Sequence, residues 1–311
     1  MTPNFTPWHP TLPLSLAPKI ASYSLPGPGH AEVEEPQAAH RIRLVNAWGR
    51  ISPGSRVLEL GCGQGTATAV LAEAVGETGH VDALDPAPPD YGAPVTLGDA
   101  QQHLSAGPVG SRITWHRATL QQFLESAAAG TRPLWDVAVL AHSIWYLESE
   151  EHLEAILAML HGRVRRVCVA EYALHASEKE AFPHVLAVLA RGTLEANKDA
   201  STENVRSPLS PSIILKKACR AGFKCIKSET LVPEPGLLDG SWEVGTVVSE
   251  HFMREADKVL YGNMRAMVAS ARDATVAAVN ALHGAKVRTM DVWVATLIPD
   301  TLLGEDQCED D

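Results

Sequence analysis

The chain lacks the features that mark membrane, secreted and nucleic-acid-binding proteins. No apolar run is long enough to span a bilayer, and the N-terminus has no basic segment followed by an apolar core. The five cysteines are scattered and form no C-x-x-C pair, which predicts reduced thiols and a cytoplasmic location. No basic block or basic-aromatic stripe is present, so we expect neither a nucleic-acid nor a membrane partner.

The remaining composition is that of a globular protein with an acidic end. Hydrophobic residues make up 45% of the 311 residues, which is enough to bury a large core. The net charge is −11, but five of the acids lie in the last seven residues, 305–311. The histidines lack metal-ligand spacing, so we predict no metal.

The most informative segment is residues 57–66, where Val-Leu-Glu-Leu is followed by Gly-Cys-Gly-Gln-Gly-Thr. An apolar run that passes through glycines into an amphipathic stretch predicts a buried parallel strand, a tight loop and a helix. Glycines also let the backbone approach a ligand closely. A dinucleotide fingerprint would carry its third glycine where Thr66 stands, so the pattern is G-x-G-x-G, with Glu59 two residues ahead.

A second element follows in the expected place. Residues 79–85 predict the next strand, and Asp85 ends it about 20 residues beyond the glycines, where a ribose-binding acid is expected. In this combination the chain resembles class I S-adenosylmethionine-dependent methyltransferases of the small-molecule type, over roughly residues 50–300. The resemblance implies a Rossmann-like fold, S-adenosylmethionine as cofactor and S-adenosylhomocysteine as product.

The order of patterns predicts an α/β fold. Strand and helix patterns alternate through residue 171, which indicates a doubly wound, mostly parallel sheet with helices on both faces. Two further strands, 223–231 and 287–298, would by the resemblance form the antiparallel pair that completes a seven-stranded sheet. About 55 residues separate them, which is long for a connection. We therefore expect a helical cap inserted at about 178–222 and 232–286 within a domain spanning 36–311.

Local signals predict two further helices and an N-terminal arm. Glu34-Glu35-Pro36 indicates a helix start, because acids suit the positive end and proline suits the first turn. Apolar spacing over 252–283 predicts one long helix in the cap. Residues 1–35 are expected to form an arm or lid, since the first 30 residues hold seven prolines.

The cofactor site follows from the resemblance. Glu59 is expected to orient the amino-acid end of the cofactor and Asp85 to bind the ribose, with Asp82 as a competing ribose ligand. The structural alternatives are a plain tight turn for the glycines, a local hydrogen bond for Glu59 and a turn cap for Asp85. The predicted cofactor-binding residues are Tyr23, Glu59, Gly61, Cys62, Gly63, Gly65, Asp85, Pro86, Ala118, Thr119 and Ala141.

The adenine end departs from the family pattern. An acid or amide usually follows the third strand, whereas residues 117–121 read Arg-Ala-Thr-Leu-Gln. Thr119, Gln121 or backbone groups are substitutes, and residues 99–101 are another candidate wall.

The acceptor side is predicted at the ends of the fourth and fifth strands, since ligands of open α/β sheets bind beyond the carboxyl ends of strands. His142 is a candidate general base, or else a structural histidine. Glu171 is a second candidate catalytic residue, or else a solvated strand end. Predicted acceptor contacts are His30, Trp145, Tyr146 and Trp242, with arm anchoring or core packing as the alternatives.

These residues predict methyl transfer from S-adenosylmethionine to a small, secondary-metabolite-like acceptor. The alternative keeps the fold and cofactor but transfers no methyl group, as in a pericyclase-like enzyme or a regulator. A nicotinamide-dependent oxidoreductase fits less well, because Thr66 replaces the glycine. A homodimer formed through the arm or cap is compatible with the sequence.

Overall fold

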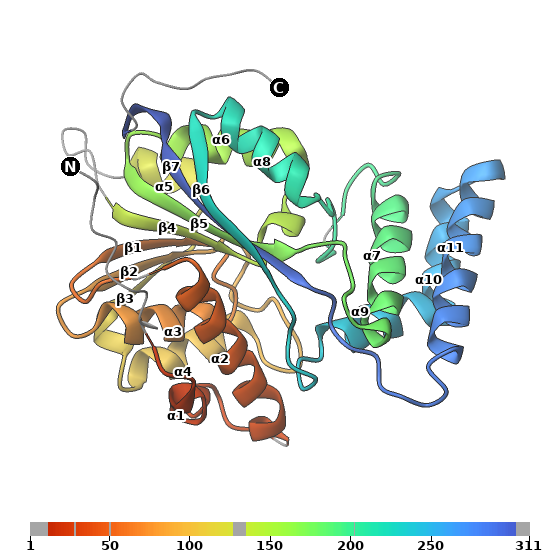
Figure 1. Ribbon diagram of the computed structural model, residues 1–311, viewed down its shortest axis with the longest axis horizontal. Coiled ribbons are helices and arrows are strands. Elements are labelled where there is room, and N and C mark those ends of the chain that lie inside the picture. The colour runs from red at the N-terminus through yellow and green to blue at the C-terminus, as the bar shows by residue number, and fades with distance from the viewer. Residues whose placement is uncertain (1–11, 28, 50, 127–134, 202, 303–311) are drawn as a thin grey trace. The chain divides into compact units, whose positions relative to one another are not determined.

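The computed structural model describes residues 12–302 except 28, 50, 127–134 and 202. Seven strands form a sheet in the order β3-β2-β1-β4-β5-β7-β6, accompanied by helices (Figure 1). The predicted α/β class with a seven-stranded sheet is confirmed. Internal contacts divide the chain into two compact units, Met1–Val139 and Leu140–Asp311. We call them the N-terminal unit and the C-terminal unit.

The N-terminal unit contains the parallel strands. β1 (Arg56–Leu60) pairs with β2 (His80–Leu84), and β2 pairs with β3 (Ile113–His116). β1 also pairs with β4 (Trp135–Ala141), with Glu59 opposite Val139. β1 and β4 are almost wholly buried, as strands covered on both faces must be.

The helices of the N-terminal unit are α1 (Ala17–Ala21), α2 (His30–Ala47), α3 (Thr66–Val75), α4 (Leu97–Ala106) and α5 (Leu120–Ser126), with 3₁₀ turns η1 (Leu14–Leu16) and η2 (Gly110–Arg112). α2 packs against α1 and α3. It begins at His30, so the predicted start at Glu34 was wrong, and Pro36 lies inside the helix. An interior proline removes one helical hydrogen bond, and here the packing of α2 outweighs that loss.

The C-terminal unit ends the sheet with antiparallel strands. β7 (Val292–Pro299) pairs with both β5 (Val164–Tyr172) and β6 (Phe223–Leu231), which confirms the predicted terminal pair. β7 begins five residues later than predicted. The preceding segment bonds to loops instead: Arg288 donates its backbone N–H to Glu180, and Asp291 donates to His175.

Two helices of this unit begin at serine caps. α6 (Glu150–Leu160) starts after Ser149, whose hydroxyl accepts the N–H of His152, and α8 (Pro211–Arg220) starts after Ser210. The two helices pack together, and Lys217 of α8 lies 3.1 Å from Glu154 of α6. The 3₁₀ turns of the unit are η3 (Ile144–Tyr146), η4 (Lys179–Ala181) and η5 (Asp300–Leu302).

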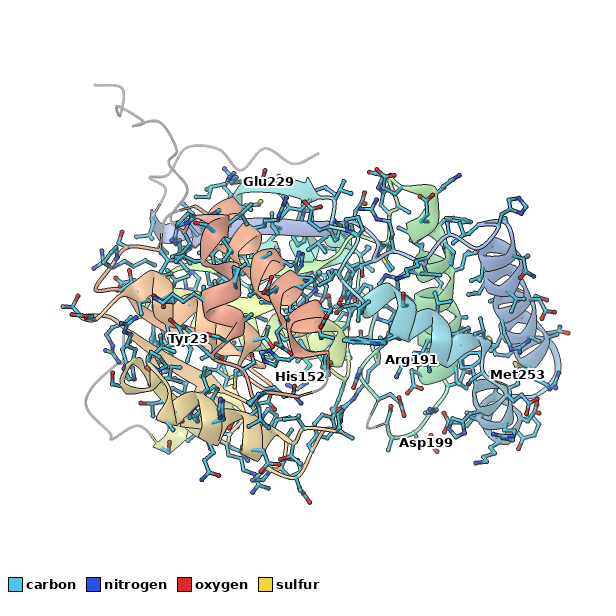
Figure 2. The ribbon with its side chains drawn as sticks, turned by 90° about the horizontal axis from the view of Figure 1, so that it is seen from below. Tyr23, His152, Arg191, Asp199, Glu229 and Met253 are labelled. Atoms are coloured by element: carbon cyan, nitrogen blue, oxygen red, sulfur yellow. The ribbon has the colours of Figure 1, made fainter. Side chains whose placement is uncertain are left out.

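Four further helices, α7 (Phe182–Glu195), α9 (Asp239–Val248), α10 (Glu250–Val259) and α11 (Gly262–Asn280), make up the region that we call the cap (Figure 1). They share a hydrophobic core of Ala187, Ala190, Leu194, Val244, Val247, Phe252, Ala256, Leu260 and Val268. Arg191 of α7, labelled in Figure 2, also donates a hydrogen bond to Glu243 of α9. The single helix predicted over 252–283 was wrong: Leu260 and Tyr261 are extended, because burying Leu260 in this core requires a turn between α10 and α11.

Candidate active site

The glycine loop joins β1 to α3 and has a backbone that other residues rarely adopt. Gly61, Gly63 and Gly65 have φ values of 75°, 53° and 92°. The N–H groups of Gly61 and Cys62 both donate to the Leu84 carbonyl at the end of β2. A Cβ on Gly65 would lie 2.7 Å from the Trp115 ring. The glycines therefore bring the loop against the end of β2 and against Trp115 of β3.

Asp85 follows β2, and its carboxylate is already oriented. Gly63 donates its N–H to Asp85 Oδ2 at 2.8 Å, and Ala87 donates to Oδ1 at 2.9 Å. Each carboxylate oxygen has a second lone pair, so both can still accept a hydroxyl. The two predicted elements of the cofactor site are thus in direct contact.

Asp85 lines an open cavity of about 110 Å³ in the N-terminal unit. Its other lining residues are Ala83, Ala87, Pro89, Leu97, Gln101, Trp115, His116 and Arg117. Gln101 donates from its amide to the Gly63 carbonyl at 2.8 Å, which joins the cavity wall to the glycine loop. The cavity presents apolar, aromatic and amide groups beside a carboxylate, which suits a nucleoside.

The residues after β3 that line the cavity differ from those predicted. Arg117 and the end of β3 line the cavity, whereas Ala118 and Thr119 do not. Thr119 exchanges two hydrogen bonds with Gln122 at the start of α5, which is a helix-capping role. Gln101, from the alternative wall at 99–101, does line the cavity. Trp115 was missed, although its place on β3 opposite Ala83 of β2 puts it beside the loop.

Glu59 is buried at the end of β1. Its carboxylate accepts a hydrogen bond from Thr68 of α3 at 2.6 Å. The pKa of Glu59 is raised to about 8, mainly by burial and also by the nearby Asp85 charge, whereas the Thr68 hydrogen bond and the Arg41 charge act in the opposite direction. Such a carboxyl is a good partner for a cation that enters the site.

The neighbouring residues take other roles. Asp82, the competing ribose candidate, accepts the Trp135 indole N–H at 2.8 Å and lies 3.0 Å from His116 Nε2. These contacts lower the pKa of Asp82 despite its burial, and they leave Asp85 as the ribose candidate. Cys62 is buried, and burial raises the pKa of its thiol. Pro86 is exposed.

The described part of the segment 1–35 contains two of the predicted site residues, Tyr23 and His30. Tyr23 donates its hydroxyl to Glu73 of α3, which also pairs with Lys19 at 2.9 Å. Tyr23, which Figure 2 labels, is buried and held against α3 by this hydrogen bond. His30 is the first residue of α2. Residues 1–11, including Trp8, lie outside the described residues.

In the C-terminal unit, His142 directly follows β4 with a left-handed backbone, φ 54°. This conformation is uncommon for a residue other than glycine and indicates a local constraint. Its N–H donates to the Ala170 carbonyl at 2.8 Å, and its Nδ1 lies 3.5 Å from Glu171 Oε1. The structure thus brings together the two predicted catalytic residues.

Glu171 is buried rather than solvated, so that alternative was wrong. Oε2 accepts the N–H groups of Ile144 and Trp145, and Oε1 accepts that of Tyr172. Three backbone donors can stabilise an ionised carboxylate away from water. In this position Glu171 holds the turn after β4 and lies beside His142.

Tyr172 and His184 complete this cluster and were not predicted. The Tyr172 ring lies 4.5 Å from the His142 ring and 5.2 Å from the His184 ring, centroid to centroid. Its hydroxyl donates to Asp239 of the cap at 2.8 Å. His184 Nδ1 accepts the Met290 N–H, and burial lowers the pKa of His184 to about 4. No sequence pattern links positions 172, 184 and 239, because the cap brings them together.

The remaining predicted acceptor contacts differ in exposure. Trp145 is buried, packs 5.2 Å from Tyr172 and donates its indole N–H to Leu209. Tyr146 and Trp242 are exposed, and Ala141 is partly exposed at the end of β4. Within the described residues, no group of side chains could hold a metal ion, and no helix is long and apolar enough to cross a membrane.

Comparisons with known proteins agree with this geometry. A model of the protein-L-isoaspartate(D-aspartate) O-methyltransferase family matches residues 35–88, which contain the glycine loop and Asp85. Methyltransferases phomM' and phomM of Diaporthe leptostromiformis are each 27% identical, covering 84% of this chain and 84% of the relative. A cyclopropane-fatty-acyl-phospholipid synthase-like protein from Lactobacillus casei, known as a crystal structure, is 29% identical with a TM-score of 0.76. That match covers 91% of this chain and 99% of the other.

The loop, the oriented Asp85 carboxylate and the adjoining cavity occur in the order that the resemblance implied, and the relatives extend the likeness over most of the chain. The chain is therefore an S-adenosylmethionine-dependent methyltransferase whose fold and glycine loop resemble those of class I members.

Proposed function

We propose that the enzyme transfers the methyl group of S-adenosylmethionine to a small, partly apolar acceptor, with secondary metabolites as the substrate class. The cavity beside Asp85 receives the nucleoside, with Asp85 accepting the ribose hydroxyls and Glu59 the ammonium of the amino-acid end. The cap, with its own hydrophobic core, supports an enclosed small acceptor rather than a macromolecule. The four described cysteines are free thiols, which supports a cytoplasmic location.

The reaction is an in-line displacement at carbon. A lone pair of the acceptor forms a bond to the methyl carbon, the bond from carbon to the sulfonium sulfur breaks, and S-adenosylhomocysteine is released. The acceptor also loses a proton if its nucleophilic atom carried one. Much of the rate enhancement comes from holding the two reacting atoms in line at contact distance.

His142 is the proposed proton acceptor, and the observation that carries this role is its constrained geometry. A left-handed backbone, a fixed N–H and a ring between Glu171 and Tyr172 leave the side chain few alternatives. Glu171 acts through His142: its carboxylate is held by three N–H groups, and it stabilises the protonated ring once the proton has been transferred.

A mass-labelling experiment tests the proposal. The purified protein is incubated with trideuteromethyl-labelled S-adenosylmethionine and an extract of small metabolites, and products are sought that gain one labelled methyl group. Asp85→Ala is the matched control, and its affinity for S-adenosylhomocysteine should fall by about 2–4 kcal/mol because two charge-assisted hydrogen bonds are lost. A native protein that binds the cofactor but forms no S-adenosylhomocysteine with any acceptor would instead favour a binding function without transfer.

A further inference from the structure

Arg41, on α2, is a cation without the partners that burial demands. Its Nε and Nη1 atoms are buried and have no hydrogen-bond partner in the described part of the chain. A buried guanidinium nitrogen without an acceptor destabilises a protein, so a ligand acceptor is the expected reason for retaining it. His30 Nε2 is likewise buried and has no hydrogen-bond partner in the described part of the chain. It lies eleven residues earlier, about three turns, on the same face of α2.

Glu59 locates the Arg41 charge. The positive charge of Arg41 acts on the Glu59 carboxyl, which requires the guanidinium to be within Coulombic reach of it. The packing is consistent with this, since α2 lies against α3 and α3 donates Thr68 to Glu59. No ion pair joins the two side chains in the described structure. The Arg41 guanidinium and the Glu59 carboxyl are therefore both available to a third group.

The cofactor carries a group that fits such a pair. The amino-acid end of S-adenosylmethionine has an ammonium and a carboxylate on the same carbon atom. A site for this end needs an anion and a cation a few Å apart that do not neutralise each other first. Glu59 supplies the anion beside the glycine loop, and Arg41 is the cation whose charge it experiences.

We propose that Arg41 binds the carboxylate of the amino-acid end of S-adenosylmethionine while Glu59 binds its ammonium. This assignment rests on the cofactor-binding part of the proposed function and does not depend on methyl transfer. Binding gives the Arg41 guanidinium an acceptor, and the ammonium of the ligand stabilises the ionised form of Glu59, which burial disfavours in the free protein.

Calorimetry with two ligands isolates the carboxylate. S-adenosylhomocysteine carries both charges, whereas its decarboxylated form, S-adenosyl-3-thiopropylamine, keeps the ammonium and lacks the carboxylate. Arg41→Met should weaken S-adenosylhomocysteine about 10- to 100-fold and change the affinity for the decarboxylated ligand by less than about 2-fold. Glu59→Gln should weaken both ligands, because both carry the ammonium.

The controls separate recognition from structure. Arg43→Met removes a cation two residues away, about 200° around the helix, and should leave both affinities unchanged. Thermal melting of ligand-free Arg41→Met should show no loss of stability, since an unsatisfied buried cation is removed. If Arg41→Met does not fold, Arg41→Lys retains the charge on a shorter side chain and should still weaken only the carboxylate-bearing ligand.

The results distinguish this assignment from the proposed function. Equal losses for both ligands, or an unchanged affinity for S-adenosylhomocysteine in folded Arg41→Met or Arg41→Lys, would overturn the role of Arg41. Absence of methyl transfer with the selective loss intact would overturn the proposed function and leave the Arg41 assignment standing. No binding of S-adenosylhomocysteine by the native protein would overturn both.

Discussion

Each unit holds one buried glutamate at the end of a central strand, and the two are stabilised differently. Glu59 of the N-terminal unit and Glu171 of the C-terminal unit are 2% and 1% exposed. Glu59 accepts a single hydroxyl, from Thr68. Glu171 accepts three backbone N–H groups and faces His142.

The difference shows what each carboxylate is suited to do. Glu171 has its partners within the fold, so it can fix the turn after β4 and the ring of His142 without a ligand. Glu59 has a single hydrogen-bond donor, and its pKa rises to about 8, mainly because burial disfavours the charged form. It therefore gains most when a cation binds. We expect substitutions at the two positions to separate catalysis from cofactor affinity.

The largest expected effect is on turnover in the C-terminal unit. His142→Gln should lower kcat about 100-fold or more with little change in affinity for S-adenosylhomocysteine, because proton transfer is lost and the cofactor site is intact. Glu171→Gln should lower kcat less, about 10-fold, because the ring remains but is held less firmly. Steady-state kinetics and calorimetry measure the two quantities. A fully active His142→Gln enzyme would exclude a base role, and a raised KM alone would indicate acceptor positioning.

The complementary effect is on affinity in the N-terminal unit. Glu59→Gln should weaken S-adenosylhomocysteine about 10-fold and leave kcat at saturating S-adenosylmethionine nearly unchanged, since a charge-assisted hydrogen bond to the ammonium becomes a neutral one. Glu171→Gln is the matched control and should bind normally. If both variants lose affinity equally, the two carboxylates do not have separate tasks.

The pH dependence of stability sharpens the comparison further. The pKa of Glu59 is about 8 in the folded protein against an ordinary 4.5, so the folded carboxyl keeps a proton that the unfolded chain releases. The free energy of unfolding should therefore fall as pH rises between about 4.5 and 8. Glu59→Gln should remove this slope, so its Tm relative to the native protein should increase across that range. A constant difference in Tm would show that Glu59 is ionised throughout.

The smallest expected effect lies at acid pH in the C-terminal unit. The pKa of His184 is lowered to about 4 from 6.5, so the unfolded chain gains a proton first and stability should fall as pH drops from 6.5 towards 4. Asp239 opposes this shift and His142 adds to it. His184→Asn retains an acceptor for the Met290 N–H and should reduce the slope in melting experiments. His251→Asn, at an exposed histidine, should not alter it.

Local sequence patterns predict the glycine loop and Asp85 of the N-terminal unit. The strand, the glycines and the next acid are close in sequence. The bonds from Gly61 and Cys62 to Leu84 are main-chain contacts, and Gly63 and Ala87 donate their N–H groups to the Asp85 side chain. The fold class and the caps at Ser149 and Ser210 were predictable for the same reason. The start of α2 was not predictable from local patterns, because helix packing decided whether Pro36 began the helix or lay within it.

The sequence by itself determined the order of strands and helices, the glycine loop and the acid after β2, because each depends on residues a few positions apart. Only the tertiary structure decided which distant side chains became neighbours: Trp115 beside Gly65, Arg41 near Glu59, and His142, Tyr172 and His184 in one cluster with Asp239. Such contacts join helices and strands far apart in the chain. They arise from burying shared hydrophobic surface, which the periodicity of one element indicates but does not assign to a partner.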